Sequence, residues 1–295
     1  MINSIEEYLN LLKIKLAGSD RATIQDALAD AEEHLRAALE SARHSQPDVK
    51  EPEALVKIID GYGMPEEVAV AYKQIESHMP AGFGYNGYPK EHSWWSRFFG
   101  VVAETKAWAA GLFMLFSLAT GIIYFTWAVT GISLSAGLLV LIIGIPLAGA
   151  FLLSVRGIGL LEGRLVEALL GVRMPHRPMF SNKSLSLWGR LKNLLTDRCT
   201  WTGLLYMILM LPLGIIYFTL FVTLLAVSLW LIVRPILEYG FGIPAFSIDV
   251  NYYTPGWLMP FSVIGGLLLG VLSLHLFKLI GKAHGNFAKA MLVRE

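Results

Sequence analysis

Four long apolar stretches dominate the second part of the chain, whereas short amphipathic stretches dominate the first. The apolar stretches cover residues 108–130, 133–155, 204–233 and 257–277. A helix needs about 20 apolar residues to cross the roughly 30 Å hydrocarbon core of a bilayer. The pattern therefore predicts four transmembrane helices, and a short turn near Gly131 makes the first two an antiparallel hairpin.

An internal repeat relates the two predicted hairpins. The hexapeptide GIIYFT occurs at residues 121–126 and again at residues 214–219, an offset of 93 residues. A repeat of fixed period indicates that the membrane domain consists of two copies of one unit. We assign the copies to residues 93–171 and 186–293. Because an even number of crossings separates them, both copies run in the same direction through the membrane.

The second copy is longer than the first. The segment GRLVEALL at residues 163–170 resembles GNFAKAML at residues 285–292, and here the offset is 122 residues. The second copy therefore carries an insertion of 29 residues. We place the insertion at residues 234–256, where Gly, Pro, Tyr and Asn are frequent.

Residues 161–170 predict a short amphipathic helix after the second span. The apolar face of this helix comprises Leu161, Leu165, Ala168 and Leu169. The side chains expected to point away from that face are Glu162, Arg164 and Glu167. Such a helix either lies on the membrane surface or packs against the other unit.

Charge is unevenly distributed along the chain. Charged residues make up 16% of the sequence, against about 25% in soluble domains. Residues 1–78 contain 8 basic and 15 acidic residues. Lys and Arg gather instead between the hairpins and in the tail, so the positive-inside rule predicts a multi-pass cell-membrane protein with both termini cytoplasmic and the insertion outside. The single cysteine excludes an internal disulfide.

Residues 1–78 predict a small acidic domain of four helices on the cytoplasmic side. Ser4 and Glu7 form a capping-box pattern at its start, and residues 79–92 are a Gly- and Pro-rich linker to the membrane. A domain of this size buries little surface, which favours a partner. Its acidic helix face is either solvated or a docking site. The acidity argues against direct nucleic-acid binding.

No sequence motif indicates catalysis. The chain lacks a phosphate-binding loop, a His-Glu-x-x-His zinc motif and a Gly-x-Ser-x-Gly elbow. We therefore expect no enzyme activity, no cofactor and no metal site. The predicted spans contain no Asp, Glu, Lys or Arg, and His275 is their single titratable residue. It either reports pH or binds a ligand, or it simply hydrogen-bonds to a neighbour.

The insertion contains candidate ligand contacts on the outer side. Aromatic and polar side chains occur together there, a mixture that is typical of ligand pockets and also of loops that lie on lipid headgroups. The candidate contacts are Asp249, Asn251, Tyr252, Tyr253 and Trp257.

Two family resemblances cover nearly the whole chain. Residues 4–76, with SIEEYLNLLKIKL, DALADAEEHLRAAL and GYGMPEEVAVAYKQI, resemble a HAAS-type domain. That resemblance implies a helical cytoplasmic signalling module, typically encoded beside PadR-like transcription regulators. The remainder resembles the bacterial and archaeal membrane domain described as a "putative sensor", through GRLVEALLGVRMP, WGRLKNLLTDRCTW and LPLGIIYFTLFVTLLAVSL. Neither resemblance implies a catalytic or ligand-binding residue.

The sequence thus predicts an all-α membrane sensor with a cytoplasmic helical head. We expect the lipid bilayer and a PadR-like helix-turn-helix regulator as its partners. Gly266 and Gly270 have the spacing that lets helices approach closely, which favours packing between helices of the domain and leaves a homodimer as a further possibility. The alternatives are a transporter or permease subunit for a neutral or lipidic substrate, and a membrane-organising protein without a ligand.

Overall fold

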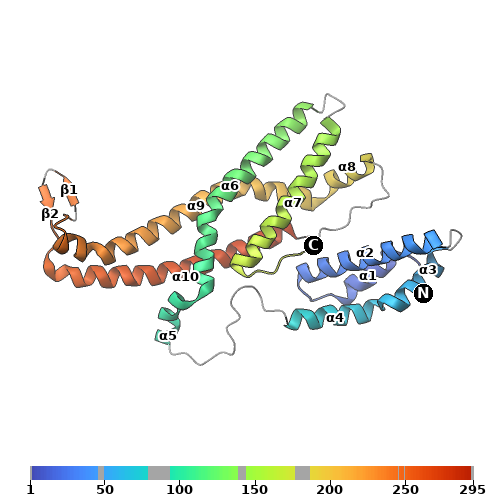
Figure 1. The fold of residues 1–295 in the computed structure, drawn as a ribbon, viewed down its shortest axis with the longest axis horizontal. Coiled ribbons are helices and arrows are strands. Elements are labelled where there is room, and N and C mark those ends of the chain that lie inside the picture. The colour runs from blue at the N-terminus through green and yellow to red at the C-terminus, as the bar shows by residue number, and fades with distance from the viewer. Residues whose placement is uncertain are drawn as a thin grey trace.

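The computed structural model is all-α, which confirms the predicted fold class, apart from one short two-stranded ribbon. It describes residues 2–45, 50–78, 94–138, 144–176, 187–244, 246–248 and 250–293. Figure 1 shows a small helical head beside a membrane domain made of two long helical hairpins. The predicted linker at residues 79–92 lies outside the described residues.

The head consists of four helices around one apolar core. The helices are α1 (Ile5–Lys15), α2 (Arg21–Ser45), α3 (Glu51–Tyr62) and α4 (Pro65–His78). Helix α1 begins at Ser4, whose Oγ accepts a hydrogen bond of 3.1 Å from the backbone N–H of Glu7, and this satisfies an otherwise unpaired donor of the first turn. Tyr8 is buried in the core, and its hydroxyl donates to the carbonyl of Gly63 at 2.8 Å.

Four helices are long and apolar enough to cross a membrane, as predicted. They are α6 (Thr105–Leu138), α7 (Gly144–Leu170), α9 (Arg198–Pro235) and α10 (Met259–Leu292). Shorter helices precede each hairpin, namely α5 (Trp94–Phe99) and α8 (Leu187–Thr196). In Figure 1 the α6–α7 hairpin crosses the α9–α10 hairpin, and the tip of the α9–α10 hairpin lies on the side of the membrane domain away from the head.

The crossing of α6 and α9 depends on two glycines at matching repeat positions. A Cβ atom on Gly121 would lie 2.5 Å from the carbonyl oxygen of Met210, and one on Gly214 would lie 2.3 Å from that of Ser117. Both distances are too short for any side chain. Since Met210 also follows Ser117 by 93 residues, the two repeats make the same contact in both directions.

The predicted turn near Gly131 is wrong. Helix α6 continues through this glycine to Leu138. A Cβ atom on Gly131 would lie 2.0 Å from the ring of Phe151 on α7. The missing side chain therefore makes room for an aromatic ring inside the hairpin, which is a packing role and not a turn.

The separate helix predicted at residues 161–170 is also wrong, because α7 runs without a break from Gly144 to Leu170. The predicted apolar and polar faces of residues 161–170 are also wrong. Leu161 is 69% exposed, whereas Glu162 is only 1% exposed. The membrane span sets the helical phase of this stretch, so the face with Glu162 and Gly163 turns toward the domain interior.

The insertion forms the tip of the second hairpin. After α9 the chain makes a π-helical turn at Ile236–Gly240, followed by β1 (Phe246–Ile248) and β2 (Val250–Tyr252), which pair antiparallel. A short 3-10 turn at Gly256–Leu258 leads into α10. Within this hairpin, Gly266 and Gly270 pack against Ser228 of α9, so their spacing serves packing between neighbouring helices of one chain.

Candidate functional site

Five polar side chains meet inside the membrane domain. They come from all four long helices and form what we call the buried polar cluster: Tyr124 of α6, Glu162 of α7, Tyr206 and Tyr217 of α9, and His284 of α10. Glu162, Tyr206 and His284 are each 1% exposed. Ionisable groups at such positions in membrane proteins usually have a function, because burying them in an apolar interior is unfavourable.

Glu162 and His284 are joined through one hydroxyl group. The hydroxyl of Tyr206 donates to Oε1 of Glu162 at 2.8 Å and lies 3.1 Å from Nε2 of His284. Tyr124 donates to the other carboxylate oxygen of Glu162 at 2.7 Å. The hydroxyl of Tyr217 lies 3.3 Å from Nδ1 of His284. The result is a continuous hydrogen-bonded chain from Tyr217 to Tyr124.

Aromatic rings enclose this chain. The ring centroids of Phe113 and His284 are 4.7 Å apart, and those of Phe287 and Tyr206 are 5.7 Å apart. These apolar rings leave the cluster in a region of low polarity. Hydrogen bonds and charges have larger energetic consequences there than in water.

The cluster is arranged symmetrically with respect to the repeat. Tyr217 follows Tyr124 by 93 residues, and His284 follows Glu162 by 122 residues. The two members of each pair therefore occupy the same position in the two copies. The symmetry is broken at two points. Glu162 is an acid where His284 is a base, and Tyr206 follows Phe113 by 93 residues, so the linking hydroxyl occurs in the second copy alone.

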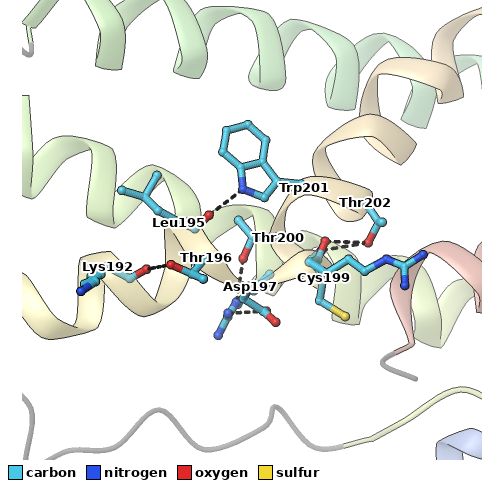
Figure 2. A network of polar contacts seen from close by, with 10 residues as sticks. Lys192, Leu195, Thr196, Asp197, Cys199, Thr200, Trp201 and Thr202 are labelled. Carbon is cyan, nitrogen blue, oxygen red and sulfur yellow. Dashed lines mark hydrogen bonds and ion pairs between the residues drawn. The ribbon is translucent and has the colours of Figure 1, made fainter.

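Two ion pairs repeat the same symmetry at the beginnings of α6 and α9. Asp197 pairs with Arg156 at 2.6 Å, and Glu104 pairs with Lys278 at 2.7 Å. Asp197 matches Glu104 at the offset of 93, and Lys278 matches Arg156 at the offset of 122. Each pair joins one copy to the other, so the two copies are held together by matching charges. Figure 2 shows Asp197 beside Thr200. The hydroxyl oxygen of Thr200 accepts a hydrogen bond from Nε of the Arg156 guanidinium.

Tryptophans close the corner between each approach helix and the long helix that follows. Figure 2 shows the Trp201 indole directed at Leu195, where its N–H donates to the backbone oxygen at 2.7 Å. At the matching position of the first copy, Trp108 donates to the backbone oxygen of Val102 at 2.8 Å. These bonds fix the direction in which each long helix leaves its approach segment.

Charged contacts attach the head to the membrane domain. The backbone N–H of His176, in the segment after α7, donates to Asp26 of α2 at 2.8 Å. The imidazole of His176 lies between Asp26, at 3.6 Å, and Glu167 of α7, at 2.8 Å. Lys289 near the end of α10 pairs with Asp20 of the head. The ends of α7 and α10 therefore both contact the beginning of α2.

Three of the predicted outer residues are described with their side chains at the tip of the second hairpin. Tyr252, Tyr253 and Trp257 are exposed at the hairpin tip, and the Tyr253 hydroxyl donates to the carbonyl of Gly242 at 3.3 Å. Asn251 lies in β2, where its backbone faces Ser247 of β1. The remaining candidate, Asp249, lies outside the described residues.

The base of this tip is held by a charged pair that sequence reasoning did not identify. Glu238 is buried and pairs with Arg234 one helical turn earlier, at 3.3 Å. Its carboxylate also accepts a hydrogen bond from the backbone N–H of Thr254, while Arg234 lies 4.8 Å from the centre of the Trp230 ring. These contacts connect the end of α9 with the segment leading into α10.

His275 bonds to a backbone group of the approach segment. Its Nε2 atom lies 3.0 Å from the carbonyl oxygen of Phe98, and its ring stacks on the Phe98 ring. Trp257 is 18 residues earlier in the same stretch, about 27 Å away at 1.5 Å per helical residue. His275 and the outer residues therefore do not belong to one site. Glu162 and His284 lie beyond the predicted spans, in the parts of α7 and α10 that continue past residues 155 and 277.

A sequence signal for Glu162 and His284 did exist. They directly precede Gly163 and Gly285, the first residues of the two similar octapeptides. Extending that alignment by one residue toward the N-terminus aligns Glu162 with His284. The signal was missed because Glu162 was assigned to a solvent-facing side of a separate helix.

Comparison with known proteins adds one finding. The family model described as "Putative sensor" matches residues 113–292, which is more than half of the chain. The match contains all five residues of the buried polar cluster. Among curated proteins and solved structures, no match was found.

Proposed function

The chain belongs to the "Putative sensor" family, and from this we propose that it is a multi-pass membrane sensor that signals through its helical head to a cytoplasmic transcription regulator. Four apolar helices form the membrane domain, and the head is a separate folded unit with its own core. A sensor needs a physical connection between the part that receives the stimulus and the part that transmits it.

The observation that carries this proposal is the contact between the head and the ends of two membrane helices. Asp20 pairs with Lys289 of α10, and Asp26 contacts His176 just after α7. A shift of α7 relative to α10 would change the distance between these two contacts. The position of α2 therefore responds to the arrangement of the membrane helices.

The head also offers a surface for a partner. Several of its apolar side chains are exposed to solvent: Ile14, Val56, Met64, Val70 and Ile75. Contiguous apolar patches mark protein-binding sites, and we propose that some of these side chains form such a patch. We propose a helix-turn-helix regulator of the PadR-like class as this partner, on the cytoplasmic side where the Lys- and Arg-rich segments lie.

Charge exchange at the head contact tests the coupling. The full-length protein in native membranes is used to capture a PadR-like helix-turn-helix regulator from the same cells, with wild type compared with Asp20→Lys, Lys289→Asp and the double variant. We expect each single variant to change the amount captured and the double variant to restore it. Capture that is absent from wild type under all conditions would contradict the proposal, as would capture indifferent to all three variants.

A transporter is the second candidate, and the buried Glu162 is the observation that favours it. Proton-coupled carriers place carboxyl groups within the membrane domain. Flux of a neutral or lipidic substrate into vesicles, lost in Glu162→Gln, would support this function. Regulator capture without any flux supports the sensor.

A further inference from the structure

We propose that the buried polar cluster is a binding site for a single proton, carried by Glu162 and coupled through Tyr206 to His284. The proposed sensor function does not itself specify a ligand, and the proton is the ligand that we add to it. The role of this proton as a stimulus rests on the proposed function, whereas the binding of the proton does not.

Hydrogen counting at Tyr206 defines the first state of the site. This hydroxyl has one hydrogen and two partners, Glu162 and His284. When it donates to Glu162, it must accept from Nε2–H of His284. The Nδ1 atom of a neutral imidazole is then an acceptor for the hydroxyl of Tyr217. Every bond of the cluster is satisfied in this state, and Glu162 carries one negative charge.

One added proton reverses the direction of these bonds. Protonated Glu162 donates to Tyr206, Tyr206 donates to Nε2 of His284, and Nδ1–H of His284 donates to Tyr217. The carboxylate gains one proton, and the imidazole keeps one proton that has changed ring nitrogen. The cluster then carries no charge. Both states use the same five side chains, so Glu162 and His284 titrate as a unit.

The groups around Glu162 explain why a proton is bound there. In the described part of the chain its hydrogen bonds come from Tyr124 and Tyr206, which are neutral. Arg173 belongs to the segment that packs over Gly163 through Met174, and its Nε atom is buried without a hydrogen-bond partner. Nearby charged groups of the helices have partners of their own: Arg156 with Asp197, Glu167 with His176, and Lys278 with Glu104. A carboxylate whose hydrogen bonds come from neutral hydroxyl groups in an apolar interior is unfavourable, and protonation removes its charge.

The site is also positioned to act on the head. Glu162 lies five residues before Glu167, and His284 lies five residues before Lys289. Glu167 holds His176, and Lys289 holds Asp20 of the head. The acid and the base of the cluster are thus on the two helices whose ends contact α2.

Infrared difference spectroscopy on the full-length protein in lipid vesicles tests proton binding directly. We expect the C=O stretching band of a protonated carboxylic acid that disappears as pH rises. The band should be absent from Glu162→Gln and unchanged in Glu104→Gln, whose carboxylate is paired with Lys278. A band that survives in Glu162→Gln would overturn the proposal. So would a Glu162 carboxyl group whose protonation is constant wherever the protein stays folded.

A second variant keeps the test valid if Glu162→Gln fails to fold. Tyr124→Phe removes one donor to the carboxylate and leaves the carboxyl group in place. We expect the midpoint of the band to move to higher pH by about one unit, because the charged form loses a hydrogen bond. An unchanged midpoint would contradict the assignment to Glu162.

The sensor function is judged separately by regulator capture at several pH values. Capture that follows the titration of the band in wild type, and is independent of pH in Glu162→Gln, supports the proton as the stimulus. Capture independent of pH in wild type, with the band still titrating, removes the proton as the stimulus and leaves the binding site intact.

Discussion

Glu162 and His284 are separated by 122 residues, the same offset as the two similar octapeptides that follow them, and one hydroxyl group, that of Tyr206, joins them. Around them Tyr124 matches Tyr217 and Gly121 matches Gly214, whereas Tyr206 matches Phe113. A symmetric frame thus encloses an asymmetric pair. An acid and a base linked in this way can be coupled through the hydrogen of the hydroxyl group between them.

The helix crossing predicts a large effect from a very small substitution. Gly121→Ala places a methyl group 2.5 Å from a backbone oxygen of α9, and the helices must separate to accept it. We expect a loss of about 1–3 kcal/mol in the free energy of unfolding, as for overpacked cores. Thermal unfolding of the protein in detergent measures the difference.

The matched control for this substitution is Gly137→Ala in the same helix. A Cβ atom there meets nothing within 4 Å, and alanine is favoured over glycine in a helix by up to about 1 kcal/mol. We expect unchanged or slightly higher stability. Equal effects at both positions would show that the close approach at Gly121 does not hold the crossing together.

The two symmetric ion pairs should differ in strength. Asp197 and Arg156 are less exposed than Glu104 and Lys278, and solvent screens a charge pair more strongly when it is exposed. We expect a coupling free energy of about 1 kcal/mol for the first pair and a smaller value for the second. Double-mutant cycles with alanine at each position measure both values. A larger coupling for the Glu104 pair would contradict this ranking.

The head should lose stability in alkaline solution through Tyr8. Burial raises the pKa of Tyr8 to about 12, and the nearby Glu67 carboxylate adds to the effect. The folded head holds this proton more tightly than the unfolded chain, whose tyrosine titrates near 10. The stabilisation is therefore complete below about pH 10 and is lost as pH rises toward about 12.

Phenylalanine at this position tests the assignment. Tyr8→Phe lacks the titrating group, so its thermal midpoint should fall less between about pH 9 and about pH 11 than that of wild type. At neutral pH it should cost about 1 kcal/mol, because the hydrogen bond to Gly63 is lost. Parallel pH profiles for the two proteins would show that another group is responsible.

Periodicity was sufficient to predict the helices but not to place their ends. Four spans and a four-helix head follow from apolar runs, and the structure contains both. Glycine was misleading, because Gly131 suggests a turn in the sequence and serves as a space for Phe151 in the fold. Which of these roles a glycine has depends on a residue from another helix, and a single sequence does not contain that information.

The buried polar cluster was missed for a related reason. Charged residues at 162, 164 and 167 suggested that the span had already ended, so Glu162 was assigned to solvent. In the structure its partners come from α6 and α9, residues 38 and 44 positions away in sequence. Only the tertiary arrangement shows that a tyrosine hydroxyl replaces water at each carboxylate oxygen.

Cross-linking across the head contact tests the coupling between the two domains most directly. Cys199 is the only native cysteine, so Asp20→Cys and Lys289→Cys in a Cys199→Ser background give a defined pair for a short bifunctional thiol reagent. The control pair is Glu40→Cys with Lys289→Cys, since Glu40 is 20 residues further along α2, about 30 Å away. We predict rapid cross-linking of the first pair in native membranes and little of the second. Absence of cross-linking in the first pair, or equal rates for both, would contradict a head held at the end of α10.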